Sequence, residues 1–182
     1  MLDVWARILA RVPNSVLWLL EDNLLAKENL IMQAQARGIT KDRLIFSERM
    51  DLPEHLARHQ LADLFLDTLP CNAHTTASDA LWAGLPVLTQ LGKTLAGRVA
   101  GSLLTAIDLP ELIAFSQKEY EDLAVELATN PAKLRAIKEK LTKNRMDSPL
   151  FNAKTFTGVL EEALTKIYQR YQGGLPPEHL DL

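Results

Sequence analysis

The sequence has 182 residues, of which 47% are hydrophobic and 24% charged, a balance typical of an ordinary folded domain. Its formal net charge of −3 excludes a general basic field for nucleic acid, so any anion must be bound locally. The single cysteine, Cys71, excludes an internal disulfide. Because the sequence shows neither a secretory signal nor an apolar run of roughly 20 residues, we expect a cytoplasmic protein without membrane segments.

Short apolar runs alternate with longer amphipathic stretches, a rhythm that indicates repeated strand–helix units on a parallel sheet. Strands are predicted at residues 15–20, 43–46, 62–67 and 86–89. Helices are predicted at residues 24–37, 53–60, 77–83 and 97–107, and Gly38 and Gly84 end two of them. The sequence thus predicts an α/β fold over residues 1–115, with a Rossmann-like open parallel sheet flanked by helices.

From residue 116 onward the pattern is helical, and Pro131 and Pro149 mark the two ends of one helix. A last amphipathic helix is predicted at residues 153–171. Its apolar residues at helical spacing are Phe156, Val159, Leu160, Ala163, Leu164, Ile167 and Tyr168. Such a stripe is usually core, so residues 116–172 are expected to form C-terminal helices packed on the sheet domain or returning from it. Residues 173–182 are expected to be a frayed tail.

A polar loop at residues 68–74 follows the third predicted strand and runs into a helix. Parallel sheets bind ligands at such loops, where helix amides and the helix dipole favour anions. The amides near Thr75–Ala77 and the hydroxyls of Thr75 and Thr76 would suit a diphosphate. Alternatively, Thr76 and Asp79 match a capping box, which needs no ligand. If Asp79 faces the cleft instead, its carboxylate suits the hydroxyls of a ribose.

His55 and Arg58 lie three residues apart on one predicted helix, so both side chains leave the same face. The arginine offers paired donors to a carbonyl of a nucleotide base, and the imidazole can stack on the ring. A solvated helix face that also carries Glu54 and His59 is the alternative interpretation.

Other motifs are weaker. Gly92-Lys93-Thr94 resembles the end of a phosphate-binding loop, but Val87 occupies the position where that motif needs its first glycine. The histidines and Cys71 lack the close spacing of a zinc site, so no metal is expected. A lone loop thiol such as Cys71 is expected to line the cleft and not to act as a nucleophile.

Several strings resemble the O-GlcNAc transferase and SPINDLY-like family, glycosyltransferase family 41. The most specific are EHLARHQLAD at residues 54–63, LDT at 66–68, CNAHTT at 71–76 and DALWAG at 79–84. Further matches are RVPNS at 11–15, LWLL at 17–20, TLAGRV at 94–99, EYED at 119–122 and SPLFN at 148–152. The resemblance therefore covers nearly the whole chain.

The resemblance implies a GT-B glycosyltransferase, in which two Rossmann-like lobes hold a UDP-sugar and an acceptor protein between them. This chain resembles the second, C-terminal catalytic lobe. The implied donor is UDP-N-acetylglucosamine, the implied acceptors are Ser and Thr of proteins, and no metal or other cofactor is implied. Relatives that use GDP-fucose make the sugar less certain than the nucleotide.

By similarity, Arg58 would contact uracil, His55 would pack on the base and Asp79 would hold the ribose. The diphosphate would be bound by His74, Thr75 and Thr76, with Cys71 lining the cleft. No residue within this chain is expected to be catalytic.

The sequence also departs from the family. Leu52 stands where the family has a lysine near the ribose, and the segment that bears the lysine of the diphosphate would precede Met1. The first catalytic lobe and the tetratricopeptide repeats, which are the expected partners, are absent too. We therefore expect this chain alone to be inactive, because a half-cleft neither excludes water nor positions an acceptor. The alternative is a non-catalytic protein-association module whose apolar C-terminal helix docks, with self-association as a consequence.

Overall fold

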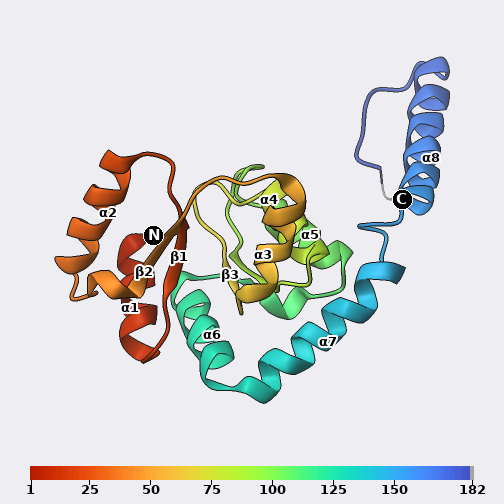
Figure 1. Ribbon diagram of the computed structural model, residues 1–182. Coiled ribbons are helices and arrows are strands. Elements are labelled where there is room, and N and C mark those ends of the chain that lie inside the picture. Colours follow the sequence, from red (N-terminus) through yellow and green to blue (C-terminus); the bar gives the residue numbers. More distant parts are fainter. Residues whose placement is uncertain (181–182) are drawn as a thin grey trace.

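The computed structural model describes residues 1–180, in which helices surround short parallel strands (Figure 1). The N-terminal part contains α1 (Leu2–Arg11), β1 (Leu17–Leu20), α2 (Leu24–Gln35), β2 (Leu44–Ser47) and α3 (Leu52–Arg58). The middle contains β3 (Phe65–Leu66), α4 (Thr75–Trp82), β4 (Val87–Gln90), α5 (Val99–Ala106) and β5 (Ile113–Ala114). The C-terminal part contains α6 (Gln117–Thr129), α7 (Pro131–Asp147) and α8 (Ala153–Gln172). Short 3-10 helices are η1 (Lys41–Arg43), η2 (His59–Leu61) and η3 (Pro110–Leu112).

All the strand pairs of the described chain are parallel, which confirms the predicted α/β class, but the strands form two groups. In one group β1 pairs with β2, and in the other β4 lies between β3 and β5. The strand predicted at residues 62–67 shrinks to Phe65–Leu66. The reason is local, because the Ala62 amide donates to the His59 carbonyl at 3.2 Å and so belongs to the end of η2. β5 was not predicted.

Helix α1, which was also not predicted, joins the two strand groups. One of its faces contributes Val4 and Ile8, and the following residue Val12, to a core cluster with β4, β5 and α6. Its other face contributes Ala6 and Leu9 to a second cluster with β1, α2 and β2. Because a helix repeats every 3.6 residues, these two sets of positions leave the helix in different directions. α1 is thus buried between the two halves of the strand layer.

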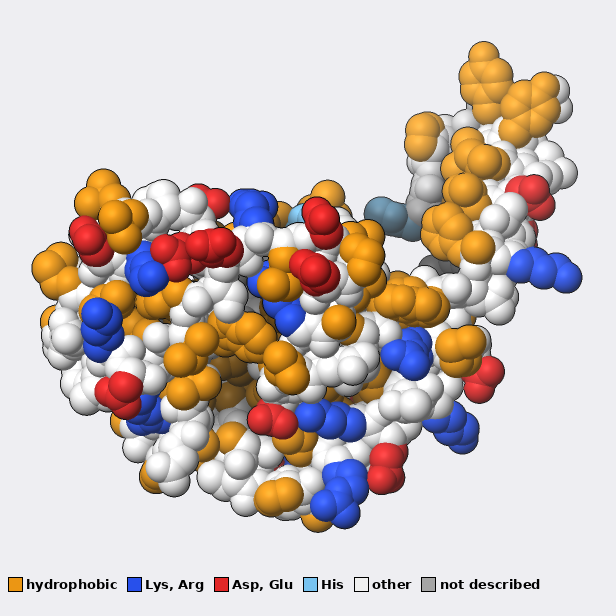
Figure 2. Space-filling view, viewed as in Figure 1, with side chains coloured by type: hydrophobic (Ala, Val, Ile, Leu, Met, Phe, Trp, Pro, Cys, Tyr) orange, Lys and Arg blue, Asp and Glu red, His pale blue; other side chains and the backbone are white. Residues whose placement is uncertain are grey.

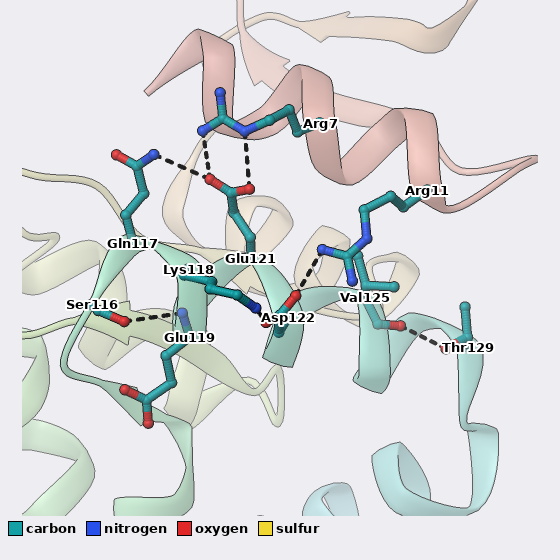
Figure 3. A network of polar contacts seen from close by, with 10 residues as sticks. All are labelled: Arg7, Arg11, Ser116, Gln117, Lys118, Glu119, Glu121, Asp122, Val125 and Thr129. Atoms are coloured by element: carbon teal, nitrogen blue, oxygen red, sulfur yellow. Dashed lines mark hydrogen bonds and ion pairs between the residues drawn. The ribbon is translucent and has the colours of Figure 1, made fainter.

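Ion pairs reinforce the packing of α1 against α6 (Figure 3). Arg7 donates two hydrogen bonds to the Glu121 carboxylate at 3.0 and 2.5 Å, and Arg11 reaches Asp122 at 2.9 Å. Lys118 pairs with the same Asp122 at 2.5 Å. The bidentate geometry of Arg7 fixes the register between the two helices.

The largest core cluster surrounds α4. The helix buries Ala77, Ala80 and Leu81 completely. Neighbours in this cluster come from β4, α5 and α7; they include Val87, Ala100, Leu104, Ile137 and Leu141. α7 also contacts the C-terminal end of α4, where Arg145 donates a hydrogen bond to the Trp82 carbonyl at 2.6 Å. The position of α4 is therefore set from several sides.

The C-terminal helix α8 leaves the rest of the molecule and projects away from it (Figure 1). None of its residues is buried, and its apolar side chains lie on an exposed surface, as Figure 2 shows. Phe156, for example, is 63% exposed and Leu164 55%. The core position that this spacing favours is therefore wrong for α8 in this chain, because residues 148–152 direct the helix away from the sheet domain.

After α8 the chain turns back, and Arg170 donates to the Pro176 carbonyl and pairs with Glu178. Residues 181 and 182 of the predicted tail lie outside the described residues. Among residues 1–180, no helix combines the length and apolar character that crossing a bilayer requires.

Candidate functional site

The candidate site is the N-terminus of α4, which begins at Thr75 with His74 as its N-cap. No side chain caps this end, and the first bond within the helix runs from the Ser78 amide to the His74 carbonyl at 3.1 Å. The amides at residues 75–77 therefore have no partner within the helix. They give α4 a positive end suited to an anion.

The capping-box interpretation of Thr76 and Asp79 is wrong. The helix begins two residues earlier than predicted, so Thr76 lies inside the first turn and is not the N-cap. Asp79 follows Thr75 by four residues, and the two side chains therefore share one face of α4. Asp79 is half-buried and Thr75 exposed, which leaves this face available to a ligand.

A buried carboxylate fixes the loop that leads into α4. Asp67, which is only 2% exposed, accepts a hydrogen bond from the Ala73 amide on Oδ1 and one from the Thr89 hydroxyl on Oδ2, both at 2.6 Å. The Tyr120 hydroxyl of α6 donates to the Asp67 carbonyl at 2.9 Å. Burial raises the pKa of Asp67, and the hydrogen bonds from Thr89 and Ala73 oppose that rise.

Sequence reasoning did not identify Asp67 as part of the site. Two signals point to it: it is an acidic residue between a short apolar run and a polar loop, and it belongs to the LDT string at residues 66–68. Its partners lie 6, 22 and 53 residues away along the chain. No spacing rule for helices or strands connects them.

A second loop, residues 92–97, supports the first. The Ala96 carbonyl accepts from the Asn72 amide at 2.8 Å and contacts His74 Nε2 at 3.4 Å. The loop is closed by the Gly92 amide, which donates to the Gly97 carbonyl at 2.7 Å. A side chain at Gly97 would place a Cβ 3.1 Å from the Pro70 carbonyl. The glycine-rich segment therefore packs tightly against the loop before α4.

On α3, His55 and Arg58 form one unit. Arg58 Nη2 donates to His55 Nδ1 at 2.8 Å, and Arg58 Nη1 donates to the Glu48 carbonyl at 2.9 Å. Because a guanidinium only donates, Nδ1 must be unprotonated and the neutral ring carries its hydrogen on Nε2. The structure therefore holds the His55 ring in one defined tautomer.

Burial lowers the pKa of His55, and the nearby charges of His59 and Arg58 lower it further. The carboxylate of Asp79, on α4, opposes these effects. The interpretation of this part of α3 as a solvated face is wrong for His59. That side chain is buried and donates from Nδ1 to the His55 carbonyl at 2.7 Å.

The predicted site residues differ in their burial. His55 and Arg58 on α3 and Asp79 on α4 are half-buried, whereas Cys71, His74, Thr75 and Thr76 at the start of α4 are exposed. The thiol of Cys71 donates to the neighbouring Asn72 carbonyl at 3.5 Å. Within residues 1–180, no group of three or more His, Cys, Asp or Glu residues has the arrangement of a metal site.

A different hollow, of about 500 Å³, lies beside α6. Its lining includes four acidic residues, Glu111, Glu119, Asp122 and Glu126, and one basic residue, Lys118; Glu119, Asp122 and Lys118 are drawn in Figure 3. Carboxylates in such number repel a diphosphate. The electrostatics therefore favour the start of α4 as the anion site.

Residues 1–160 match the model of Glycosyl transferase family 41. The chain belongs to this family. The UDP-N-acetylglucosamine--peptide N-acetylglucosaminyltransferase of Caenorhabditis elegans is 40% identical to it over 179 residues, which are 98% of this chain and 16% of that protein. A probable enzyme of the same description, SEC of Arabidopsis thaliana, is 40% identical over 178 residues, or 97% of this chain and 18% of that protein.

A solved structure of family 41 type shares the fold. A mutant O-GlcNAc transferase from Thermobaculum terrenum has a TM-score of 0.86 and 32% sequence identity, covering 92% of this chain and 33% of that one. The predicted family and fold class are thereby confirmed. This chain spans less than one fifth of the length of the two curated family 41 relatives.

Proposed function

We propose that this chain is the nucleotide-sugar-binding part of a protein O-linked N-acetylglucosaminyltransferase. Its donor would be UDP-N-acetylglucosamine and its acceptors Ser and Thr hydroxyls of proteins. The observation that carries this proposal is the uncapped N-terminus of α4, with Asp79, His55 and Arg58 beside it. The names of the relatives, which specify UDP-N-acetylglucosamine and peptide, support the choice of donor and acceptor.

Each side chain has a role that its chemistry supports. The amides at residues 75–77 and the hydroxyls of Thr75 and Thr76 would bind the diphosphate, whose charge grows as the glycosidic bond breaks. No metal or other cofactor is needed for that stabilisation in this proposal. His74 lies beside the same amides, and Cys71 lines the approach.

The nucleoside would lie between α3 and α4. Neutral His55 offers a planar face to uracil, and Asp79 accepts hydrogen bonds from the ribose hydroxyls. Arg58 uses two of its nitrogens to hold His55 and the Glu48 carbonyl. Since a guanidinium has five N–H donors, others are left for a carbonyl of the base.

Transfer itself would require more than this chain. In the proposed enzyme a first catalytic lobe and a tetratricopeptide-repeat region would position the acceptor protein and close the cleft. Without that positioning, most of the rate advantage of a bound donor is lost. We expect no measurable sugar transfer by the isolated chain.

Isothermal titration calorimetry with UDP, GDP and UDP-N-acetylglucosamine tests the binding role. We expect UDP to bind more tightly than GDP, and a double variant, Arg58→Ala with Asp79→Ala, to lose that preference. The matched control is Asp3→Ala with Arg37→Ala, which removes an ion pair of 2.6 Å on the surface between α1 and α2 and should keep the preference. Equal affinity for the two nucleotides, or none for UDP, would contradict the proposal.

One observation favours a second function, protein association through α8. The helix exposes an apolar face that no other part of the described chain covers, and such surfaces commonly bind other proteins. Sedimentation velocity should then show self-association that a Leu160→Glu, Leu164→Glu variant abolishes. A monomer over the whole accessible concentration range would count against this function.

A further inference from the structure

We propose that Asp67 is a positioning residue for the anion site, acting through the Ala73 amide to set the direction in which the chain enters α4. This inference rests on the proposed function and assigns a role to a residue that would not itself touch the ligand. Asp67 is almost completely buried, whereas the residues expected to bind the diphosphate are exposed.

The two carboxylate oxygens of Asp67 bind two different parts of the structure. Oδ1 accepts from the Ala73 amide in the loop, and Oδ2 accepts from the Thr89 hydroxyl on β4, each at 2.6 Å. The residue's own amide donates to the Leu88 carbonyl at 3.0 Å, and its carbonyl accepts from Tyr120 at 2.9 Å. The carboxylate is thus a rigid link between the sheet and the loop.

The Ala73 amide is a sensitive place for such a link because Ala73 directly precedes the N-cap, His74. The direction of that peptide unit determines where the free amides at residues 75–77 point. No side chain caps α4. The bond from the Ala73 amide to Asp67 instead fixes the residue that precedes the N-cap. Other bonds of the loop, from Asn72 to the Ala96 and Thr68 carbonyls, lie farther from the helix.

Hydrogen-bond geometry, and not the negative charge, is what this role requires. An asparagine at position 67 could accept from Ala73 with its carbonyl oxygen and donate to Thr89 with its amide, because a hydroxyl both donates and accepts. Asp67→Asn should therefore preserve the position of the loop. Alanine at the same position provides neither bond.

The test uses paired variants of the whole chain. Thr89→Val is the background, because it removes the hydroxyl that alanine at position 67 would leave unpaired in the core. Thr89→Val and the double variant Thr89→Val, Asp67→Ala both lack the bond to Thr89, and only the second also lacks the bond to Ala73. Asp67→Asn is the conservative variant expected to behave as the unmodified chain does.

Two measurements are made on each variant. Amide hydrogen exchange by NMR, without nucleotide, reports on residues 73–77, with α5 as an internal reference for global stability. Calorimetry then compares UDP with uridine, which shares the base and ribose but lacks the diphosphate. We expect the double variant to exchange faster at residues 73–77 only, and its preference for UDP over uridine to fall about tenfold. Thr89→Val and Asp67→Asn should show neither change.

Unchanged exchange at residues 73–77 in the double variant would overturn the inference, as would an unchanged preference for UDP over uridine. Faster exchange over the whole molecule would assign Asp67 to general stability and overturn the inference as well. If Asp67→Asn matched the double variant, charge and not position would be the important property. Lack of UDP binding by the unmodified chain would contradict the proposed function, whereas the exchange rates would still decide whether Asp67 positions the loop.

Discussion

Helices α4 and α8 are both amphipathic, yet they differ in the burial of their apolar side chains. α4 buries Ala77, Ala80 and Leu81 completely, whereas α8 buries nothing. The amides at the start of α4 are held in place by two loops and a buried carboxylate. The apolar face of α8 meets solvent along its length (Figure 2). This chain alone therefore supplies the residues that pack around α4 and support the proposed nucleotide site. It supplies no residues that cover the apolar face of α8.

The difference shows that an apolar stripe on a helix does not by itself place that helix in the core of the chain. Helical spacing predicts that one side of a helix will avoid water, and it does not say which part of which chain will cover it. Matched substitutions in the two helices measure how far the comparison holds.

The largest expected effect comes from core leucines. Leu81→Ala should lower the free energy of unfolding by about 3 kcal/mol, because it leaves a cavity in a fully buried cluster. Leu164→Ala, at a site that is 55% exposed, should cost less than about 1 kcal/mol. Urea unfolding followed by circular dichroism gives both values. Equal losses would show that α8 is covered in solution, for instance in a dimer.

The next effect is that of replacing glycine by alanine, which should change the stability in opposite directions in the two helices. Gly84, just after α4, has a φ of +88°, a conformation that costs an alanine roughly 1–2 kcal/mol. Gly158 lies inside α8, and a Cβ there would meet no atom within 4 Å. Gly84→Ala should therefore destabilise the protein, and Gly158→Ala should raise the helicity and stability of α8 by about 0.5–1 kcal/mol.

Thermal melting monitored by circular dichroism is a sufficient measurement for this pair. The Cβ of an alanine at position 84 would lie 3.8 Å from Arg145 Nη1, an ordinary contact, so its effect would come from the backbone and not from a clash. A stabilised Gly84→Ala variant would contradict the left-handed conformation of that residue.

The smallest effect concerns charge. The hydrogen bond from Arg7 is the largest cause that lowers the pKa of Glu121 below its ordinary value of 4.5. The folded state therefore favours the ionised form, so this contribution to stability is present above about pH 4.5 and is lost as the pH falls below it. Glu121→Gln should destabilise the protein at pH 7 and have progressively less effect in acid.

Glu162→Gln in α8 is the matched control, because Glu162 pairs with Lys166 at 2.7 Å on an exposed helix face. Exposed pairs of this kind contribute little, so its effect at pH 7 should be smaller than that of Glu121→Gln. Urea titrations at several pH values compare the two variants. An effect of Glu121→Gln that did not change with pH would exclude the ion pair as its cause.

Local rules predicted the part of the fold that depends on local sequence. Gly38 and Gly84 end helices as expected, and both have positive φ angles. The helix starting at Pro131 and the alternation of strands and helices also agree with the structure. In each case the signal lies within one element or in the residue that follows it.

Features that depend on distant contacts were missed. α1 carries apolar residues at helical spacing, such as Trp5, Ile8 and Leu9, with Arg7 and Arg11 on the opposite side. Its local signal was therefore present and was not used, whereas its two sets of core partners depend on distant contacts. β5 has only two residues, too few for a period to be visible. The His59 side chain was assigned to a solvated face because its bond to the His55 carbonyl cannot be read from residue type.

The candidate site shows the same division. Motif spacing brought attention to His55 and Arg58 on α3 and to the residues around the start of α4. Asp67 escaped notice because its bonds join β3 to β4, to α6 and to the loop before α4. The LDT string at residues 66–68 contains Asp67, but a string gives no role to a residue whose partners are distant in the sequence.

The position of α1 between the two strand groups also has a consequence for synthesis. Arg7 and its partner Glu121 are separated by 114 positions, so a ribosome that adds about 5–20 residues per second needs on the order of ten seconds to make one after the other. During that interval the side chains of Val4, Ile8 and Val12 have no α6 to cover them. This core cluster can therefore be completed only after α6 has been made.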